Sequence, residues 1–256
     1  MRACTRQPQG VARLSTGRLA QGIVFIDTPT IAASYRNTQD NADVALRSGG
    51  ASFSTLNRVG SAAGWYWSLP SSHPLYSVTG DITYGVFGAA HTAHSSYPAM
   101  LTVPPVSGVL SGPYATQELN GDGSFGVLIG GSNYGTAGSS VGDTTNTKSN
   151  YIGIRRGTTI SSYKNGVENW SSASCPSGAL DWGTKQPLAL HGITSSLNQG
   201  SGMTGTVELI VIWGRALEVS EVRELNNNYW QVLAELPRWL YTSAGAGSWT
   251  PLEVQG

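Results

Sequence analysis

Charged side chains are scarce in this sequence. Lys, Arg, Asp and Glu together make up 12% of the 256 residues, about half of the share found in an average globular protein. Fifteen basic and fifteen acidic residues cancel, so the formal net charge is zero. Because nucleic-acid binding depends on a basic surface that neutralises phosphates, this composition argues against nucleic acid as the main partner.

Cysteines and long apolar runs are also lacking. Cys4 and Cys175 are too few for a disulfide framework and too far apart for a cysteine-based metal site, so we expect two free thiols. No run approaches the ~20 apolar residues of a membrane-spanning helix, and we expect no membrane partner. The N-terminus carries Arg2 and Arg6 without the apolar core of a secretory signal, so we expect synthesis in the cytoplasm.

Glycine and large aromatic residues are abundant by contrast. The 33 glycines supply turns, while eight Trp and eleven Tyr supply enough apolar area to argue against a disordered chain. Short apolar or alternating runs recur between turn signals, which predicts many short strands. The expected strands are 22–26, 51–56, 65–67, 81–87, 99–103, 124–129, 151–155, 159–163, 167–170, 188–190 and 207–213.

Residues 205–230 contain the most informative local pattern. The apolar, β-branched run from Val207 to Trp213 predicts a strand buried on both faces. A short helix is expected to follow, with Val222 and Leu225 on its buried side. We expect Ser220 to cap this helix, because serine is a favoured residue at helix N-termini.

These elements define an all-β fold, namely an antiparallel jelly-roll β-sandwich with one short helix near the C-terminus. We expect an N-terminal arm without strand or helix period at residues 1–20, one sandwich domain at 21–230 and a C-terminal extension at 231–256. Residues 131–149 are almost all Gly, Ser, Thr, Asn and Asp, which predicts a long polar loop. Loops of this length usually carry a function or contact a partner.

Two motifs resemble those of the laminin-G-like, concanavalin-like family. The residues YKNGV at 163–167 are similar to the family's Tyr-x-Asn-Gly hairpin. About 45 residues later, VIWGRAL at 211–217 is similar to its closing strand and the entry to its helix. The resemblance covers roughly residues 60–230 and implies a lectin-like sandwich.

The two ends carry a second resemblance, to laminin-G-like proteins of tailed bacteriophages. The similar segments are TRQPQ at 5–9, LAQGIV at 19–24, NYWQVL at 228–233 and PRW at 237–239. Tyr229 stands where those proteins have proline. This resemblance implies a structural or adhesion protein of the virion, placed on the head or on the tail.

Catalytic patterns are missing or out of context. GDGSFG at 121–126 matches G-x-G-x-x-G, but no strand–helix unit surrounds it, so we interpret it as a turn. His91 and His94 lack a further metal ligand nearby. The expected strands carry no pair of carboxylates spaced for glycoside cleavage, and Glu208 stands alone on its strand. We therefore expect that the protein is not an enzyme and has no cofactor.

Calcium is the one metal that the sequence leaves open. Asp122 and Asp143 lie in expected rim loops and are candidate calcium ligands, because calcium prefers carboxylate and amide oxygens. The alternative is that both residues only cap turns.

Four residues are candidates for contact with a sugar. Tyr134 and Asn133 lie in the expected polar loop, where an aromatic ring and an amide are free to meet a ligand. Trp65 and Trp67 alternate on one side of an aromatic strand and would form either a stacking platform or part of the core.

The sequence therefore predicts a non-enzymatic component of a phage virion, either a head decoration or fibre or a tail-associated protein. We expect other virion proteins as partners and a homo-oligomer, because the open edges of a sandwich invite pairing. The alternative is a carbohydrate-binding adhesin that recognises a glycan on the host surface. The predicted location is the virion, after synthesis in the host cytoplasm.

Overall fold

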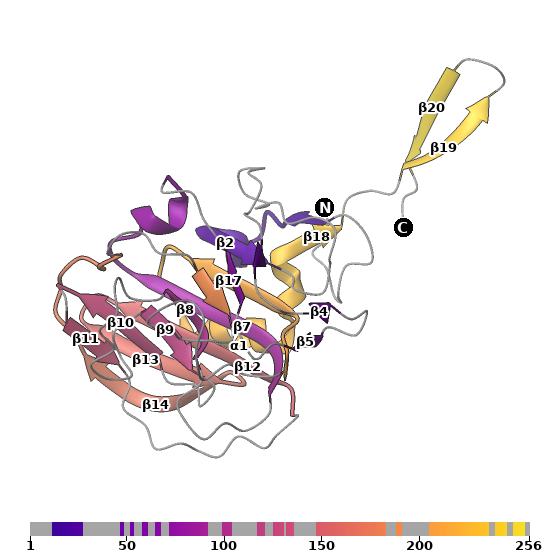
Figure 1. The fold of residues 1–256 in the computed structure, drawn as a ribbon. Coiled ribbons are helices and arrows are strands. Elements are labelled where there is room, and N and C mark those ends of the chain that lie inside the picture. Colours follow the sequence, from indigo (N-terminus) through magenta and orange to yellow (C-terminus); the bar gives the residue numbers. More distant parts are fainter. Residues whose placement is uncertain are drawn as a thin grey trace.

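The fold is an antiparallel β-sandwich with a helical layer on one side (Figure 1). The computed structural model describes residues 12–27, 47–48, 52–53, 58–60, 65–67, 72–91, 99–103, 117–120, 125–130, 132–135, 147–182, 188–190, 205–235, 239–244 and 248–253. The predicted all-β class, with a short α-helix near the C-terminus, is confirmed. In this part of the chain, no helix is long and apolar enough to cross a membrane.

The larger sheet has nine strands and the smaller sheet has seven. The larger sheet consists of β14 (Val167–Ser174), β13 (Thr159–Lys164), β12 (Ser149–Arg156), β7 (Ile82–His91), β17 (Leu209–Trp213), β2 (Ile23–Asp27), β16 (Gly205–Thr206), β5 (Arg58–Gly60) and β4 (Ser52–Phe53). The first four of these strands lie side by side in this order, and the sheet divides after β7. One branch continues from β7 through β17 to β2, and the other continues from β7 through β16 and β5 to β4.

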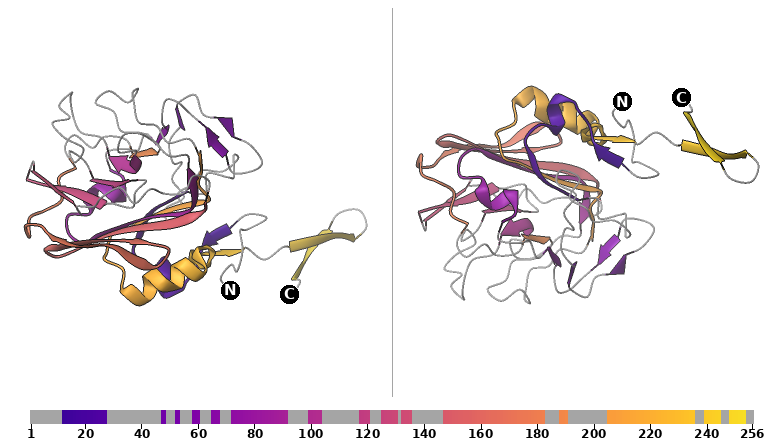
Figure 2. Two further views of the ribbon diagram at one scale, coloured as in Figure 1. Left: turned by 90° about the horizontal axis from the view of Figure 1, so that it is seen from below. Right: turned by 90° about the horizontal axis from the view of Figure 1, so that it is seen from above.

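The smaller sheet lies against one face of the larger sheet, and three of the four helices in the described part of the chain lie against the other (Figure 2). In spatial order it consists of β11 (Ser132–Gly135), β10 (Phe125–Ile129), β9 (Gln117–Asn120), β8 (Ala99–Val103), β15 (Leu188–Leu190), β6 (Trp65–Trp67) and β3 (Arg47–Ser48). These three helices are η1 (Arg18–Ala20), α1 (Val219–Asn227) and η3 (Tyr229–Val232). The fourth, η2 (Pro74–Ser77), lies on the side of the smaller sheet, where Leu75 and Tyr76 pack into the core between the sheets. Two further pairs are β1 (Ala12–Leu14) with β18 (Leu233–Glu235), and β19 (Trp239–Ala244) with β20 (Ser248–Glu253).

Strand β17 is the central element predicted from the sequence. All five of its residues are buried, and it pairs with β7 on one side and β2 on the other. Its side chains alternate between the two faces of the sheet. Ile210 and Ile212 enter the core between the sheets, whereas Leu209, Val211 and Trp213 enter the core beneath the helices.

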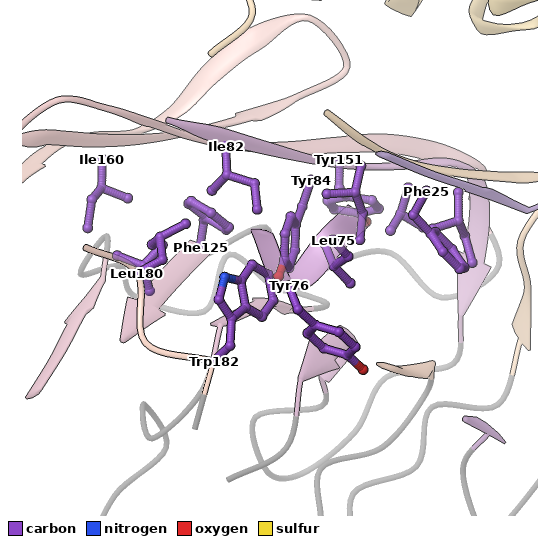
Figure 3. Close-up of a cluster of buried hydrophobic side chains, with 14 of the residues drawn as sticks. Phe25, Leu75, Tyr76, Ile82, Tyr84, Phe125, Tyr151, Ile160, Leu180 and Trp182 are labelled. Atoms are coloured by element: carbon purple, nitrogen blue, oxygen red, sulfur yellow. The ribbon is translucent and has the colours of Figure 1, made fainter. Parts of the chain in front are cut away.

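The core between the two sheets is rich in aromatic rings (Figure 3). Tyr84 and Phe125 contact each other edge to face across the sandwich, with ring centroids 5.5 Å apart. Phe125 lies directly on Gly153 of β12, where a Cβ atom would come within 2.2 Å of its ring. Gly153 therefore allows the two sheets to approach closely at this point.

The second core lies between the larger sheet and the helical layer. Leu217, Val222 and Leu225 are fully buried there, as the predicted helix face requires. Trp213 lies beneath them, and its Nε1 donates to the carbonyl of Leu19 at 2.7 Å. Buried tryptophans usually find such a partner, and this one ties the N-terminal segment to the closing strand.

Three local predictions were wrong. The helix is capped by Glu218 rather than Ser220, because Glu218 and Glu221 form a reciprocal capping box. Residues 12–20 form β1 and η1, and Leu19 and Ala20 are buried, so this part of the expected arm packs against the sandwich. Strand β11 lies inside the segment expected to be a loop.

Arg155 is a buried arginine that holds two loops together. Only 2% of the residue is exposed, and it lies on β12. Its guanidinium donates to the carbonyls of Gly80 at 2.9 Å and Gly178 at 2.6 Å, and at longer range to those of Thr79 and Pro176. The planar fork of arginine suits several fixed acceptors, which a lysine ammonium cannot satisfy together.

Replacing Arg155 with lysine should lower the free energy of unfolding by about 2–3 kcal/mol, because buried carbonyls would lose their donors. The measurement is urea unfolding of Arg155→Lys. Arg156→Lys is the matched control, since Arg156 is exposed and pairs with the exposed Glu218. Equal midpoints for the two variants would contradict the role assigned to Arg155.

Candidate ligand-binding site

The four predicted sugar-contacting residues do not form one site. Asn133 and Tyr134 lie on β11, at one edge of the smaller sheet, whereas Trp65 and Trp67 lie on β6, next to the opposite edge. Five strand-to-strand steps separate them, or about 24 Å. Tyr134 is half-buried and packs against the core between the sheets, so it belongs to a strand and not to an exposed loop.

The predicted calcium ligands Asp122 and Asp143 lie outside the described residues. Within the described ranges, no three His, Cys, Asp or Glu side chains gather in a way that could hold a metal ion.

A β-bulge in the larger sheet creates a polar cluster that the sequence did not reveal. Opposite β12, two residues of β7, Phe87 and Gly88, face the single residue Asn150. Gly88 adopts a φ of +60°, and a Cβ atom there would come within 2.8 Å of the Glu208 carboxylate. Gly88 is thus required both by its backbone conformation and by the space that Glu208 occupies.

Glu208 is the centre of this cluster. The residue is 8% exposed, and it accepts hydrogen bonds from the Tyr229 hydroxyl and the Lys148 ammonium. Burial raises the pKa of Tyr229, and the adjacent Glu208 carboxylate raises it further. The Tyr229 ring stacks on Phe87, with centroids 5.3 Å apart. Two partners that are distant in the sequence, Lys148 and Tyr229, thus compensate the buried carboxylate, as a buried charge requires.

Three asparagines extend the cluster toward the surface. The Oδ1 atom of Asn150 accepts from the Gly88 N–H at 3.0 Å, and its Nδ2 donates to Oδ1 of Asn226 at 3.0 Å. The Asn150 N–H donates to Oδ1 of Asn165 at 2.8 Å. Asn165 and Gly166 form the predicted turn between β13 and β14, with φ values of +52° and +77°.

We call this group the Glu208 cluster and define it as Lys148, Asn150, Asn165, Glu208, Asn226 and Tyr229. Asn165 is exposed, and 63% of the Lys148 side chain is exposed, so both can reach a ligand. The other members are buried or half-buried and hold the exposed ones in place. The ion pair leaves the cluster with no net charge, which suits an uncharged ligand rich in hydrogen-bonding groups.

Sequence reasoning missed this cluster because its members are far apart in the chain. Lys148 lies 60 positions and Tyr229 lies 21 positions from Glu208. The predicted Asn165–Gly166 turn was the available signal, because this turn places the Asn165 amide beside Asn150 of β12.

No known protein-family model matches the chain, and no curated protein matches it. Several solved structures share its fold. The binding domain of Paraclostridial mosquitocidal protein 1 is 14% identical with a TM-score of 0.57, and the match covers 83% of this chain and 53% of that one. A mutant Trypanosoma rangeli sialidase that displays trans-sialidase activity is 14% identical with a TM-score of 0.57, over 82% and 33% of the two chains.

A third similar structure is domain 4 of AbnA, a GH43 extracellular arabinanase from Geobacillus stearothermophilus, in complex with arabinotriose. It is 13% identical with a TM-score of 0.50, and the match covers 84% of this chain and 98% of that domain. The match spans only about a third of the sialidase, covering 33% of the sialidase chain. At these identities the likeness concerns the fold, and the fold agrees with the predicted sandwich.

Gly88→Ala should destabilise the protein more than Gly130→Ala. Both glycines have similar positive φ values, +60° and +57°, but a Cβ atom at Gly130 would meet nothing within 4 Å. The control therefore measures backbone strain alone, about 1–2 kcal/mol. At Gly88 the displaced carboxylate should add about 1–2 kcal/mol more. The difference is measured by urea unfolding, and equal losses would show that Glu208 can move freely.

Proposed function

We propose that the protein is a non-enzymatic carbohydrate-binding protein and that the Glu208 cluster is its binding site. The observation that carries this proposal is the cluster's composition: amides, a phenol and a neutralised ion pair beside the bulge of the larger sheet. Sugars present several hydroxyl groups, each of which both donates and accepts, and amide side chains offer both functions. The ligand class that fits is therefore an uncharged glycan.

The geometry also favours a preformed site. Glu208, Asn150 and Asn226 are fixed by bonds to one another, to Tyr229 or to backbone groups. Ligand binding would then order few side chains, which lowers the entropic cost of association. Lys148 and Asn165 are the members that would contact the sugar directly, because they are exposed.

The similar solved structures support the proposal by analogy of fold. One of them, the arabinanase domain, holds arabinotriose. Fold analogy is weaker support than the site, since one fold hosts many functions. Within the cluster Glu208 is the one carboxylate, and both of its oxygens accept hydrogen bonds, which favours binding over acid–base catalysis.

A glycan array probed with the full chain tests this proposal. We expect binding to an uncharged glycan, and about tenfold weaker binding by Asn165→Asp, the loss expected for one good hydrogen bond. Asn227→Asp, the same chemical change at an exposed position of α1 outside the Glu208 cluster, is the matched control and should bind normally.

The array is probed both in calcium and in a chelator, because Asp122 and Asp143 remain candidate ligands. Binding that disappears in the chelator would move the site to those residues. No binding to any glycan, or equal binding by Asn165→Asp and Asn227→Asp, would contradict the Glu208 cluster as a sugar site.

A structural role in a virion is the second candidate, and it rests on the resemblance of the chain ends. One structural observation favours it. Strands β1 and β18 are antiparallel, with Ala12 opposite Glu235, so the chain before β1 and the chain after β18 leave from the same end of this strand pair. Both flanking segments could then dock on one neighbouring virion protein.

Deletion of residues 1–11 tests this docking. It spares β1 and the buried part of η1, so the sandwich should fold normally, as judged by its thermal midpoint. We expect the shortened protein to be absent from particles that incorporate the full chain. Normal incorporation would contradict docking through the N-terminal segment.

A further inference from the structure

The hairpin of β19 and β20 forms a sheet of its own. Six residue pairs join the two strands, from Trp239 opposite Glu253 to Ala244 opposite Ser248. Among the described strands, neither pairs with any strand of the sandwich, and the hairpin projects away from it in Figure 1. An isolated two-stranded hairpin is only marginally stable in water, so this element needs further pairing to persist.

Proline blocks one of the two outer edges of the hairpin. Pro251 lies in the middle of β20, opposite Tyr241. Because proline has no N–H, it fits within a strand only where that position faces away from the partner strand. The outer edge of β20 therefore lacks a donor at its centre, which disfavours the addition of a strand there.

No described strand other than β20 pairs with β19, so its outer edge is open to addition as far as the described residues extend. In an antiparallel ladder, residues directly opposite each other form hydrogen-bonded and non-hydrogen-bonded pairs in alternation. The Tyr241–Pro251 pair is a non-hydrogen-bonded pair, because Pro251 has no N–H to donate to Tyr241. The N–H and C=O groups of Trp239, Tyr241 and Ser243 therefore point outward from β19. No residue of β19 is proline, so this edge offers a complete row of donors and acceptors.

We propose that β19 is a dimerisation strand that pairs antiparallel with β19 of a second copy of this chain. One open edge per chain suits a symmetric dimer, in which the same edge of both copies meets, whereas two open edges would permit fibres. The symmetric pair also places no like charges opposite each other, because β19 has the sequence WLYTSA. The product is a four-stranded sheet with Pro251 on both outer edges.

Sedimentation of the full chain tests the proposal. We expect a concentration-dependent dimer of about twice the 26.9 kDa chain mass. Tyr241→Pro removes an outward N–H without removing a bond inside the hairpin, and it should give a monomer. Pro251→Thr opens the second edge and should give species larger than a dimer. The thermal midpoint of the sandwich should be unchanged in both variants.

Amide hydrogen exchange distinguishes the occupants of the β19 edge without any substitution. The outward amides of Tyr241 and Ser243 should be protected at high protein concentration and should lose protection on dilution. Protection that persists in a monomer would mean that another segment of the same chain occupies the edge. Absence of protection at every concentration, or a wild-type monomer at high concentration, would overturn the proposal.

Discussion

The Arg215 guanidinium holds the helical layer on the larger sheet. It donates to both carboxylate oxygens of Glu221, at 2.8 and 2.9 Å, and to the carbonyls of Gln21 and Arg18, which lie 194 and 197 positions away. Glu221 is only 2% exposed, so removal of Arg215 would leave a buried charge without its main partner. Arg215 therefore joins the N-terminal segment, the exit of β17 and the start of α1.

Glu221 also sets where the helix begins. One of its oxygens accepts from the Glu218 N–H at 2.8 Å, which completes the capping box. Burial alone would raise the pKa of Glu221, but the bonds from Arg215 and Glu218 and the charges of Arg215 and Arg18 lower it overall. A lowered pKa stabilises the fold when the carboxyl is ionised, and this contribution is lost as the pH falls through the acid range.

The position of α1 in turn determines the Glu208 cluster. Asn226 lies at the end of α1, and Tyr229 begins η3 directly after it. Asn226 contacts Asn150, and Tyr229 contacts Glu208, so a helix that begins at the right residue delivers both side chains to the bulge at Gly88. The proposed binding site is thus built on packed secondary structure, which favours a defined geometry.

The sequence was most informative where neighbouring residues decide the outcome. The run of β17, the Asn165–Gly166 turn and the buried face of α1 follow from local periodicity and turn chemistry, and the structure confirms all three. The N-cap was misplaced because serine propensity was weighed without the Glu218–Glu221 pair. The Glu208 cluster and the buried Arg155 could not be predicted, because their partners meet only through the strand order of the sheet.

Amide hydrogen exchange of Arg215→Gln tests most directly whether this side chain organises the helical layer. We predict faster exchange at residues 18–22 and at residues 219–229 together, with little change in β12 and β13. Arg223→Gln, at an exposed position on the same helix, should leave exchange unchanged. Faster exchange in only one of the two segments, or in neither, would contradict the account.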